Sequence, residues 1–178
     1  MIGLVRHPDS PCSAVTYVEA EAIRAPGGVL LLRFVLKGSL EQVRLPQPAP
    51  SARTDDLWRH TCFEAFVQAE GEEGYLEFNL SPSTEWAAYA FDGYRRGMRP
   101  AGAAPMIEVK QGPDVLDLTA TLDLGAALPS AADWRIGLSA VVETGEGLSY
   151  WTLAHAPGRA DFHHRDCFAL ELPATDRP

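Results

Sequence analysis

The chain contains 178 residues, of which 46% are hydrophobic and 22% are charged, and its formal net charge is -9. A chain of this length and composition forms one domain with a substantial core, which excludes disorder, collagen and coiled coil. The acidic balance argues against nucleic acid or an anionic membrane as a partner, because both require a basic face. We therefore expect a single domain over residues 1–178.

Short runs of alternating apolar and polar residues, separated by turn residues, dominate the chain. The runs Ala14–Ile23 and Val29–Lys37 flank a Pro-Gly-Gly turn and predict a hairpin. Further strands are expected at Cys62–Gln68, Tyr75–Leu80, Glu85–Phe91, Met106–Lys110, Val115–Leu124, Trp134–Glu143, Leu148–Ala154 and Asp166–Leu172. About ten short strands at this spacing indicate an all-β fold, an antiparallel two-sheet β-sandwich of the jelly-roll kind.

Two expectations concern the second half of the chain. The segment Leu124–Ala132 is a candidate for a short helix. The alternation of the last strand directs Phe168, Leu170 and Leu172 into the core.

The cysteines and the N-terminus bear on the compartment. Cys12, Cys62 and Cys167 are odd in number and widely spaced, which is typical of a reducing compartment rather than of a disulfide framework. The N-terminus lacks the basic and apolar regions of a signal peptide, and the longest apolar run, Val29–Leu36, is too short to cross a membrane. We expect a cytoplasmic protein.

Polar residues share one face of two adjacent predicted strands. If these strands pair across the turn between them, Glu64, Glu77 and Asn79 lie together on one sheet face. Carboxylate, amide and aromatic groups on one face suit sugar recognition, because rings take the C–H faces and polar groups take the hydroxyls. The alternative is an ordinary solvated outer face of a sandwich.

Three tryptophans are candidate stacking platforms. Trp58, Trp86 and Trp151 could each pack on a ligand, and each could equally belong to the core. In particular, the alternation places Trp86 on the same face as Ala88 and Ala90.

A histidine-rich segment near the C-terminus allows a different chemistry. Three of the five histidines fall between residues 155 and 164. Together with nearby positions they could form a nitrogen and sulfur site for zinc, or a haem site, although the spacing matches no standard zinc pattern. The residues of this alternative are His60, Cys62, His163, His164 and Cys167. The simpler interpretation is a rigid loop whose histidines form hydrogen bonds.

The usual enzyme signatures are absent from the sequence: there is no phosphate loop, dinucleotide fingerprint, nucleophile elbow or zinc-protease motif. Glu64 and Glu77 could serve as a glycoside hydrolase pair, but nothing in the sequence separates their pKa values. The sequence therefore favours a binding module over an enzyme.

Three blocks carry a resemblance to a known family: Leu57–Glu64, Glu77–Pro82 and Trp151–Phe168. With these blocks the chain resembles the DOMON-like domains related to family-9 carbohydrate-binding modules, and within them a bacterial subgroup. The resemblance implies a jelly-roll sandwich that binds a sugar, or in some relatives haem, without catalysis. It also implies that tryptophans clamp a terminal sugar; Trp58 matches one of them.

We therefore predict a module for a carbohydrate or another small polar ligand. Tryptophans would stack on the ring, carboxylate, amide and guanidinium groups would hold hydroxyls, and the histidine loop would close one side. The predicted ligand-binding residues are Trp58, Arg59, His60, Glu64, Glu77, Asn79, Trp86, His155, Phe162 and His163. The alternatives are the metal or haem protein described above and a protein–protein interaction domain whose aromatic face is covered by a partner.

Overall fold

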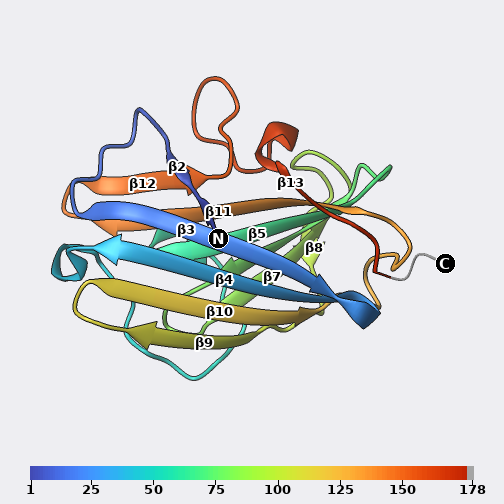
Figure 1. Ribbon diagram of the computed structural model, residues 1–178, viewed down its shortest axis with the longest axis horizontal. Helices are drawn as coiled ribbons and strands as arrows, with labels where there is room; N and C mark the ends of the chain where they lie inside the picture. Colours follow the sequence, from blue (N-terminus) through green and yellow to red (C-terminus); the bar gives the residue numbers. More distant parts are fainter. Residues whose placement is uncertain (176–178) are drawn as a thin grey trace.

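The computed structural model describes residues 1–175 as two antiparallel sheets packed face to face (Figure 1). The smaller sheet has the order β1 (Ile2–Gly3), β3 (Val15–Ala25), β4 (Val29–Gly38), β10 (Val115–Asp123), β9 (Met106–Gln111). The larger sheet has the order β2 (Val5–Arg6), β12 (Gly147–Thr152), β11 (Trp134–Thr144), β5 (Cys62–Ala69), β6 (Tyr75–Leu80), β7 (Trp86–Phe91), β8 (Arg99–Pro100), and β13 (Leu170–Leu172) also pairs with β11. The predicted all-β, two-sheet sandwich is confirmed.

The alternation in the strands produces the main core between the sheets. In β4, Leu30, Leu32, Phe34 and Leu36 are buried, while the residues between them face outward. Across the interface, Phe34 stacks on Phe63 of β5 with ring centroids 5.0 Å apart. Burial of these side chains is the main source of stability.

The larger sheet is buried on both of its faces in its centre. All six residues of β6 are buried, although only alternate ones face the main core. The others face a second apolar cluster on the far side of the sheet, which consists of Phe66, Tyr75, Ala87, Tyr89, Phe91, Val141, Phe162, Cys167 and Phe168. Strands buried on both faces lose the simple inside–outside alternation.

The expectation of a helix at Leu124–Ala132 is wrong. This segment forms turns, and its backbone carbonyls at Pro129, Ser130 and Ala132 accept hydrogen bonds from the Arg24 guanidinium at 2.7–3.4 Å. Pro129 has no backbone N–H to donate to a helix, and its ring disfavours the helical conformation of the residue before it. The buried arginine thus stabilises an irregular loop.

The last strand is shorter than expected and Phe168 faces the other way. Residues Arg165–Cys167 form a 3₁₀ turn, and the strand is limited to Leu170–Leu172. Phe168 packs in the second apolar cluster against Gly137 of β11. If position 137 carried a side chain, its Cβ atom would lie only 2.9 Å from Phe168 Cδ1. Gly137 of β11 therefore provides the space that Phe168 occupies, and no alternation within the strand could predict this.

The helical content of residues 1–175 consists of the 3₁₀ turns η1 (Pro26–Gly28), η2 (Leu40–Gln42), η3 (Leu57–Arg59) and η4 (Arg165–Cys167). Within this range, no helix has the length and apolar character that a bilayer span requires. The three cysteines are free thiols, and those of β5 and η4 are buried.

Candidate functional site

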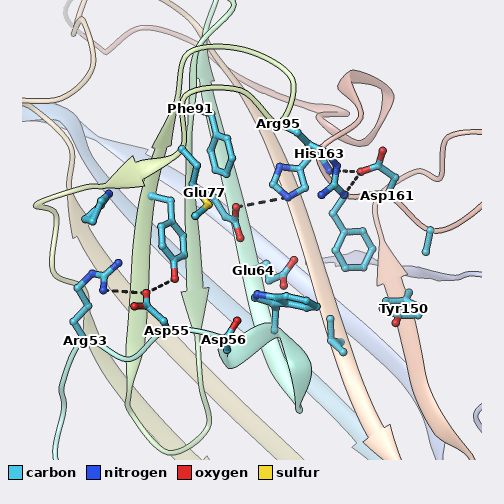
Figure 2. Close-up of a pocket in the computed structure, with 17 residues that line it drawn as sticks. Arg53, Asp55, Asp56, Glu64, Glu77, Phe91, Arg95, Tyr150, Asp161 and His163 are labelled. Carbon is cyan, nitrogen blue, oxygen red and sulfur yellow. Dashed lines mark hydrogen bonds and ion pairs between the residues drawn. The ribbon is translucent and has the colours of Figure 1, made fainter.

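A pocket of about 660 Å³ opens on the face of the larger sheet that is turned away from the main core (Figure 2). Its floor comes from β5, β6, β7, β11 and β12, and its walls come from three connecting segments, residues 53–58, 95–100 and 160–163. The lining residues are Arg53, Asp55, Asp56, Trp58, Glu64, Glu77, Tyr89, Phe91, Arg95, Met98, Pro100, Val141, Tyr150, Ala160, Asp161, Phe162 and His163. This volume is typical of a small-ligand site.

Two glutamates lie at the floor of the pocket, on neighbouring strands. Glu64 of β5 pairs in register with Asn79 of β6, so that Glu77 occupies the diagonal position on the same face. The side chains of Glu64 and Glu77 converge in Figure 2, and the two residues are only 4% and 6% exposed. Glu77 Oε1 accepts a hydrogen bond from Asn79 Nδ2 at 2.7 Å, and Glu64 Oε2 accepts one from Ser139 Oγ at 3.4 Å.

The surroundings of the two carboxyl groups favour their neutral forms. Burial raises the pKa of Glu64 well above its ordinary value, and the neighbouring charge of Glu77 raises it further. Burial also raises the pKa of Glu77, against the opposing effects of the Asn79 hydrogen bond and the Arg95 charge. The two groups titrate as a pair, because the charge of one affects the other.

The hydrogen bond to Tyr75 fixes the orientation of the His163 ring. Nδ1 lies 2.8 Å from Tyr75 Oη, which also accepts the backbone N–H of Arg95 at 3.2 Å. Either the hydroxyl or the imidazole can donate in the contact between the two side chains. The other ring nitrogen, Nε2, lies 3.7 Å from Glu77 Oε2, so His163 faces the carboxyl pair (Figure 2).

We expect His163 to stay neutral in mildly acidic solution. Burial, with the nearby Arg95 charge as the second cause, lowers the pKa of His163 to about 4. An NMR titration of the imidazole C–H resonances, assigned with His163→Gln, should show one histidine that titrates near that value. A midpoint for His163 close to 6.5 would contradict the burial seen here.

An ion pair holds the histidine loop against the sheet. Arg95, which follows β7, donates from Nη2 to Asp161 Oδ1 at 2.7 Å, and Tyr94 Oη donates to the other oxygen of the same carboxylate. Asp161 Oδ1 also accepts the backbone N–H of His163 at 3.2 Å. One carboxylate thus connects the segment after β7 to the wall that carries His163, and these contacts lower the pKa of Asp161 although burial alone would raise it.

The opposite wall begins with a second ion pair and ends with an exposed indole. Arg53 Nη1 lies 3.0 Å from Asp55 Oδ1, which also accepts the hydroxyl of Tyr89 at 2.5 Å. Burial and this carboxylate raise the pKa of Tyr89 to about 12. Asp56 has a left-handed backbone (φ 64°) and leads into η3, which places Trp58 at the pocket with 46% of its surface exposed.

The pocket brings together half of the predicted ligand-binding residues. Trp58, Glu64, Glu77, Phe162 and His163 line it. Glu64, Glu77 and Asn79 share one sheet face, as predicted. The Asn79 side chain, however, is fully buried and donates its hydrogen bond to the Glu77 carboxyl group. The predicted solvated alternative for this face is wrong, because both glutamates are buried.

Four other predicted residues lie elsewhere. The prediction for Trp86 is corrected: its side chain packs against the main core, on the face that it shares with Ala88. His155 Nε2 contacts the carbonyl of Val5 at 2.8 Å, outside the pocket. Arg59, the last residue of η3, is exposed, and its guanidinium lies 5.1 Å from the centre of the Trp58 ring. His60, the next residue, is also exposed, and its Nδ1 lies 2.8 Å from Glu143 Oε2.

The alternative metal set, His60, Cys62, His163, His164 and Cys167, does not come together. His164 Nδ1 accepts the backbone N–H of Asp166 at 3.3 Å, and the Cys167 thiol donates to the carbonyl of Asp161 at 3.2 Å. Within residues 1–175, no group of three or more His, Cys, Asp and Glu side chains is arranged to hold a metal ion.

Sequence reasoning missed part of the pocket. Tyr89, Phe91 and Tyr150 could have been found, because the alternation of β7 and β12 directs them away from the main core. Arg95 and Asp161 could not, because they lie in irregular segments and are 66 positions apart in the sequence.

The comparisons with known proteins concern the fold. No family model and no curated protein matches the chain. A candidate carbohydrate-binding protein from Bacteroides uniformis ATCC 8492 is similar, with a TM-score of 0.72 and 15% identity over 93% of this chain and 82% of that one. A family 9 carbohydrate-binding module from Caldicellulosiruptor kristjanssonii is also similar, both in complex with glucose (TM-score 0.54, 9% identity, 96% and 83% covered) and with cellotriose (0.51, 11%, 82% and 70%). The chain therefore has the sandwich fold of these proteins.

Proposed function

We propose that this domain is a non-catalytic carbohydrate-binding module that holds a sugar in the pocket on the larger sheet. The observation that carries this proposal is the combination of buried carboxyl groups at the floor, Glu64 and Glu77, with the exposed indole of Trp58. Carboxyl groups in fixed positions can bond sugar hydroxyls, while an indole face packs on the C–H groups of the ring. The sandwich shared with modules solved with glucose and cellotriose supports the proposal.

The finer relationship, to a bacterial subgroup of DOMON-like domains, belongs to the same proposal. It rests on the sequence blocks Leu57–Glu64, Glu77–Pro82 and Trp151–Phe168. The first two of these blocks contribute Trp58, Glu64 and Glu77 to the pocket, so the resemblance and the geometry concern the same residues.

We assign the carboxyl pair to ligand recognition rather than to hydrolysis. The two groups line the same pocket as the exposed indole of Trp58, and the sequence carries none of the usual enzyme signatures.

Calorimetric titration tests the proposal directly. The purified protein is titrated with glucose, cellotriose and a panel of other mono- and oligosaccharides, and we expect saturable binding to at least one. Trp58→Ala should weaken that binding by about tenfold, because it removes the stacking surface at the mouth.

Tyr17→Ala is the matched control, since Tyr17 is an exposed aromatic residue on β3 in the other sheet. Its affinity for the same sugar should equal that of the wild type. Flat titrations across the panel would reject the proposal, as would equal losses in the two variants.

A further inference from the structure

The charges around the pocket are unevenly compensated. Each of the two arginines that line it is already engaged: Arg53 with Asp55 at 3.0 Å, and Arg95 with Asp161 at 2.7 Å. The remaining wall carboxylate, that of Asp56, lies 3.3 Å from Nε of the exposed Arg59 in η3. Neither floor glutamate pairs with an arginine of the lining; His163 Nε2 lies 3.7 Å from Glu77 Oε2 and forms an ion pair only if the imidazole is protonated.

The contacts of the floor glutamates are with neutral groups. Glu64 accepts from the Ser139 hydroxyl and Glu77 from the Asn79 amide, and Nε2 of His163, whose pKa burial lowers to about 4, is 3.7 Å from Glu77. The ionisable groups that face the pair from the surrounding elements are Cys62, Tyr75, Tyr89, Arg95, Tyr150, Asp161 and His163. Arg95 is the single cation in this set, and its guanidinium is bound to the histidine loop.

The shape and the lining of the pocket suit a cationic group. Buried carboxylates without a counter-ion are strongly disfavoured, so a ligand that brings a positive charge gains both attraction and hydrogen bonds. Aromatic side chains also line the pocket, and ring faces attract ammonium groups. These rings belong to Trp58, Tyr89, Phe91, Tyr150 and Phe162.

We propose that the preferred ligand is a sugar with a free, protonated amino group, whose ammonium binds between Glu64 and Glu77. This inference rests on the carbohydrate-binding function proposed above and specifies the chemical class of its ligand. The ammonium donates hydrogen bonds to the two carboxylates, while the remainder of the sugar contacts the indole of Trp58. A neutral sugar brings no such charge, so the floor carboxyl groups keep their protons.

The proposal has a consequence for proton exchange. Burial raises the pKa of both floor carboxyl groups, and a bound cation lowers it again, so binding of an amine releases protons. The affinity for an amino sugar should therefore rise as the pH increases from about 5 to about 7, above which the amine itself begins to lose its charge. The affinity for a neutral sugar should not rise in this way.

Calorimetry with three matched sugars tests the inference at about pH 6.5, where an amine is still protonated. Glucosamine should bind at least about tenfold more tightly than glucose, and N-acetylglucosamine, whose nitrogen is neutral, should lose this advantage. Titrations in two buffers with different ionisation enthalpies should show proton release with glucosamine alone.

Variants locate the effect at the floor. In Glu64→Gln and in Glu77→Gln, the ratio of glucosamine to glucose affinity should fall towards one, whereas the exposed control Glu108→Gln on β9 should keep the wild-type ratio. Glucose binding as tight as glucosamine binding would overturn the amine preference and leave the proposed carbohydrate function intact. If none of the sugars binds, both the inference and the proposed function fail. The comparison of the three sugars needs the wild type only, so a variant that fails to fold does not remove the test.

Discussion

Glu64→Gln should make the protein more stable, with an increase of about 2 kcal/mol in the free energy of unfolding at neutral pH. Glu64 is 4% exposed, and its surroundings oppose its charge. A glutamine has nearly the same shape, can accept the Ser139 hydroxyl and can donate to the Glu77 carboxylate. Urea unfolding of both proteins measures the difference.

The pH dependence of this gain identifies its cause. Because the folded-state pKa of Glu64 is raised above 4.5, the folded protein binds more protons than the unfolded chain above that pH, and stability falls as the pH rises towards the folded-state value. At low pH the protonated glutamate resembles glutamine, so the difference between the two proteins should be small. The difference should then grow with pH, from about 4.5, where the carboxyl group ionises in the unfolded chain, up to the raised pKa of the folded state.

Glu108→Gln is the control for charge number, since it removes one carboxylate from the exposed face of the other sheet. Its effect should stay within about 0.5 kcal/mol of the wild type at every pH. A Glu64→Gln protein that is less stable than the wild type at neutral pH would show that the carboxylate is stabilised by its surroundings, contrary to our interpretation.

Asp161→Ala should produce the largest loss of both stability and binding. The carboxylate of Asp161 accepts hydrogen bonds from the Arg95 guanidinium, the Tyr94 hydroxyl and the backbone of His163. Its removal leaves a partly buried guanidinium without this partner, with an expected cost of about 2–3 kcal/mol. Sugar affinity should fall by at least about tenfold, because the wall that carries His163 is released.

Unfolding experiments and calorimetry measure the two effects, and hydrogen exchange locates the loss of order. Faster exchange should be confined to the segments around residues 92–97 and 155–165, while the strands keep their protection. Asp9→Ala, at an exposed position near the N-terminus, is the matched control. Wild-type affinity in Asp161→Ala would mean that the loop does not contribute to the site.

The strands and the floor of the pocket could be predicted from the sequence, because they depend on local alternation. The pattern in residues 62–68 and 75–80 is sufficient to place Glu64, Glu77 and Asn79 on one face, and the register confirms it. The same alternation puts Trp86 on the face of β7 that carries Ala88, which is the core face. The prediction of Trp86 as a stacking platform did not follow this rule.

The walls of the pocket could not be predicted, because they depend on contacts between distant and irregular segments. No periodic signal connects Arg95 to Asp161, or Phe168 to Gly137. Alternation also cannot reveal that the outer face of a sheet is covered by a loop, and for that reason a solvated face remained an open alternative for residues that are buried.

Burial on both faces of the larger sheet makes the floor of the pocket rigid, whereas the walls of the pocket are loops. The floor carboxyl groups are attached to two neighbouring paired strands, Glu64 to β5 and Glu77 to β6, and the strand residues around them are buried on both faces of the sheet. The two groups are therefore held in place before a ligand arrives and lose little freedom on binding. The walls are irregular segments with fewer constraints on their sequence. On the function proposed here, changes in the loops would alter how many sugar units fit, while the proposed charge preference at the floor would stay the same.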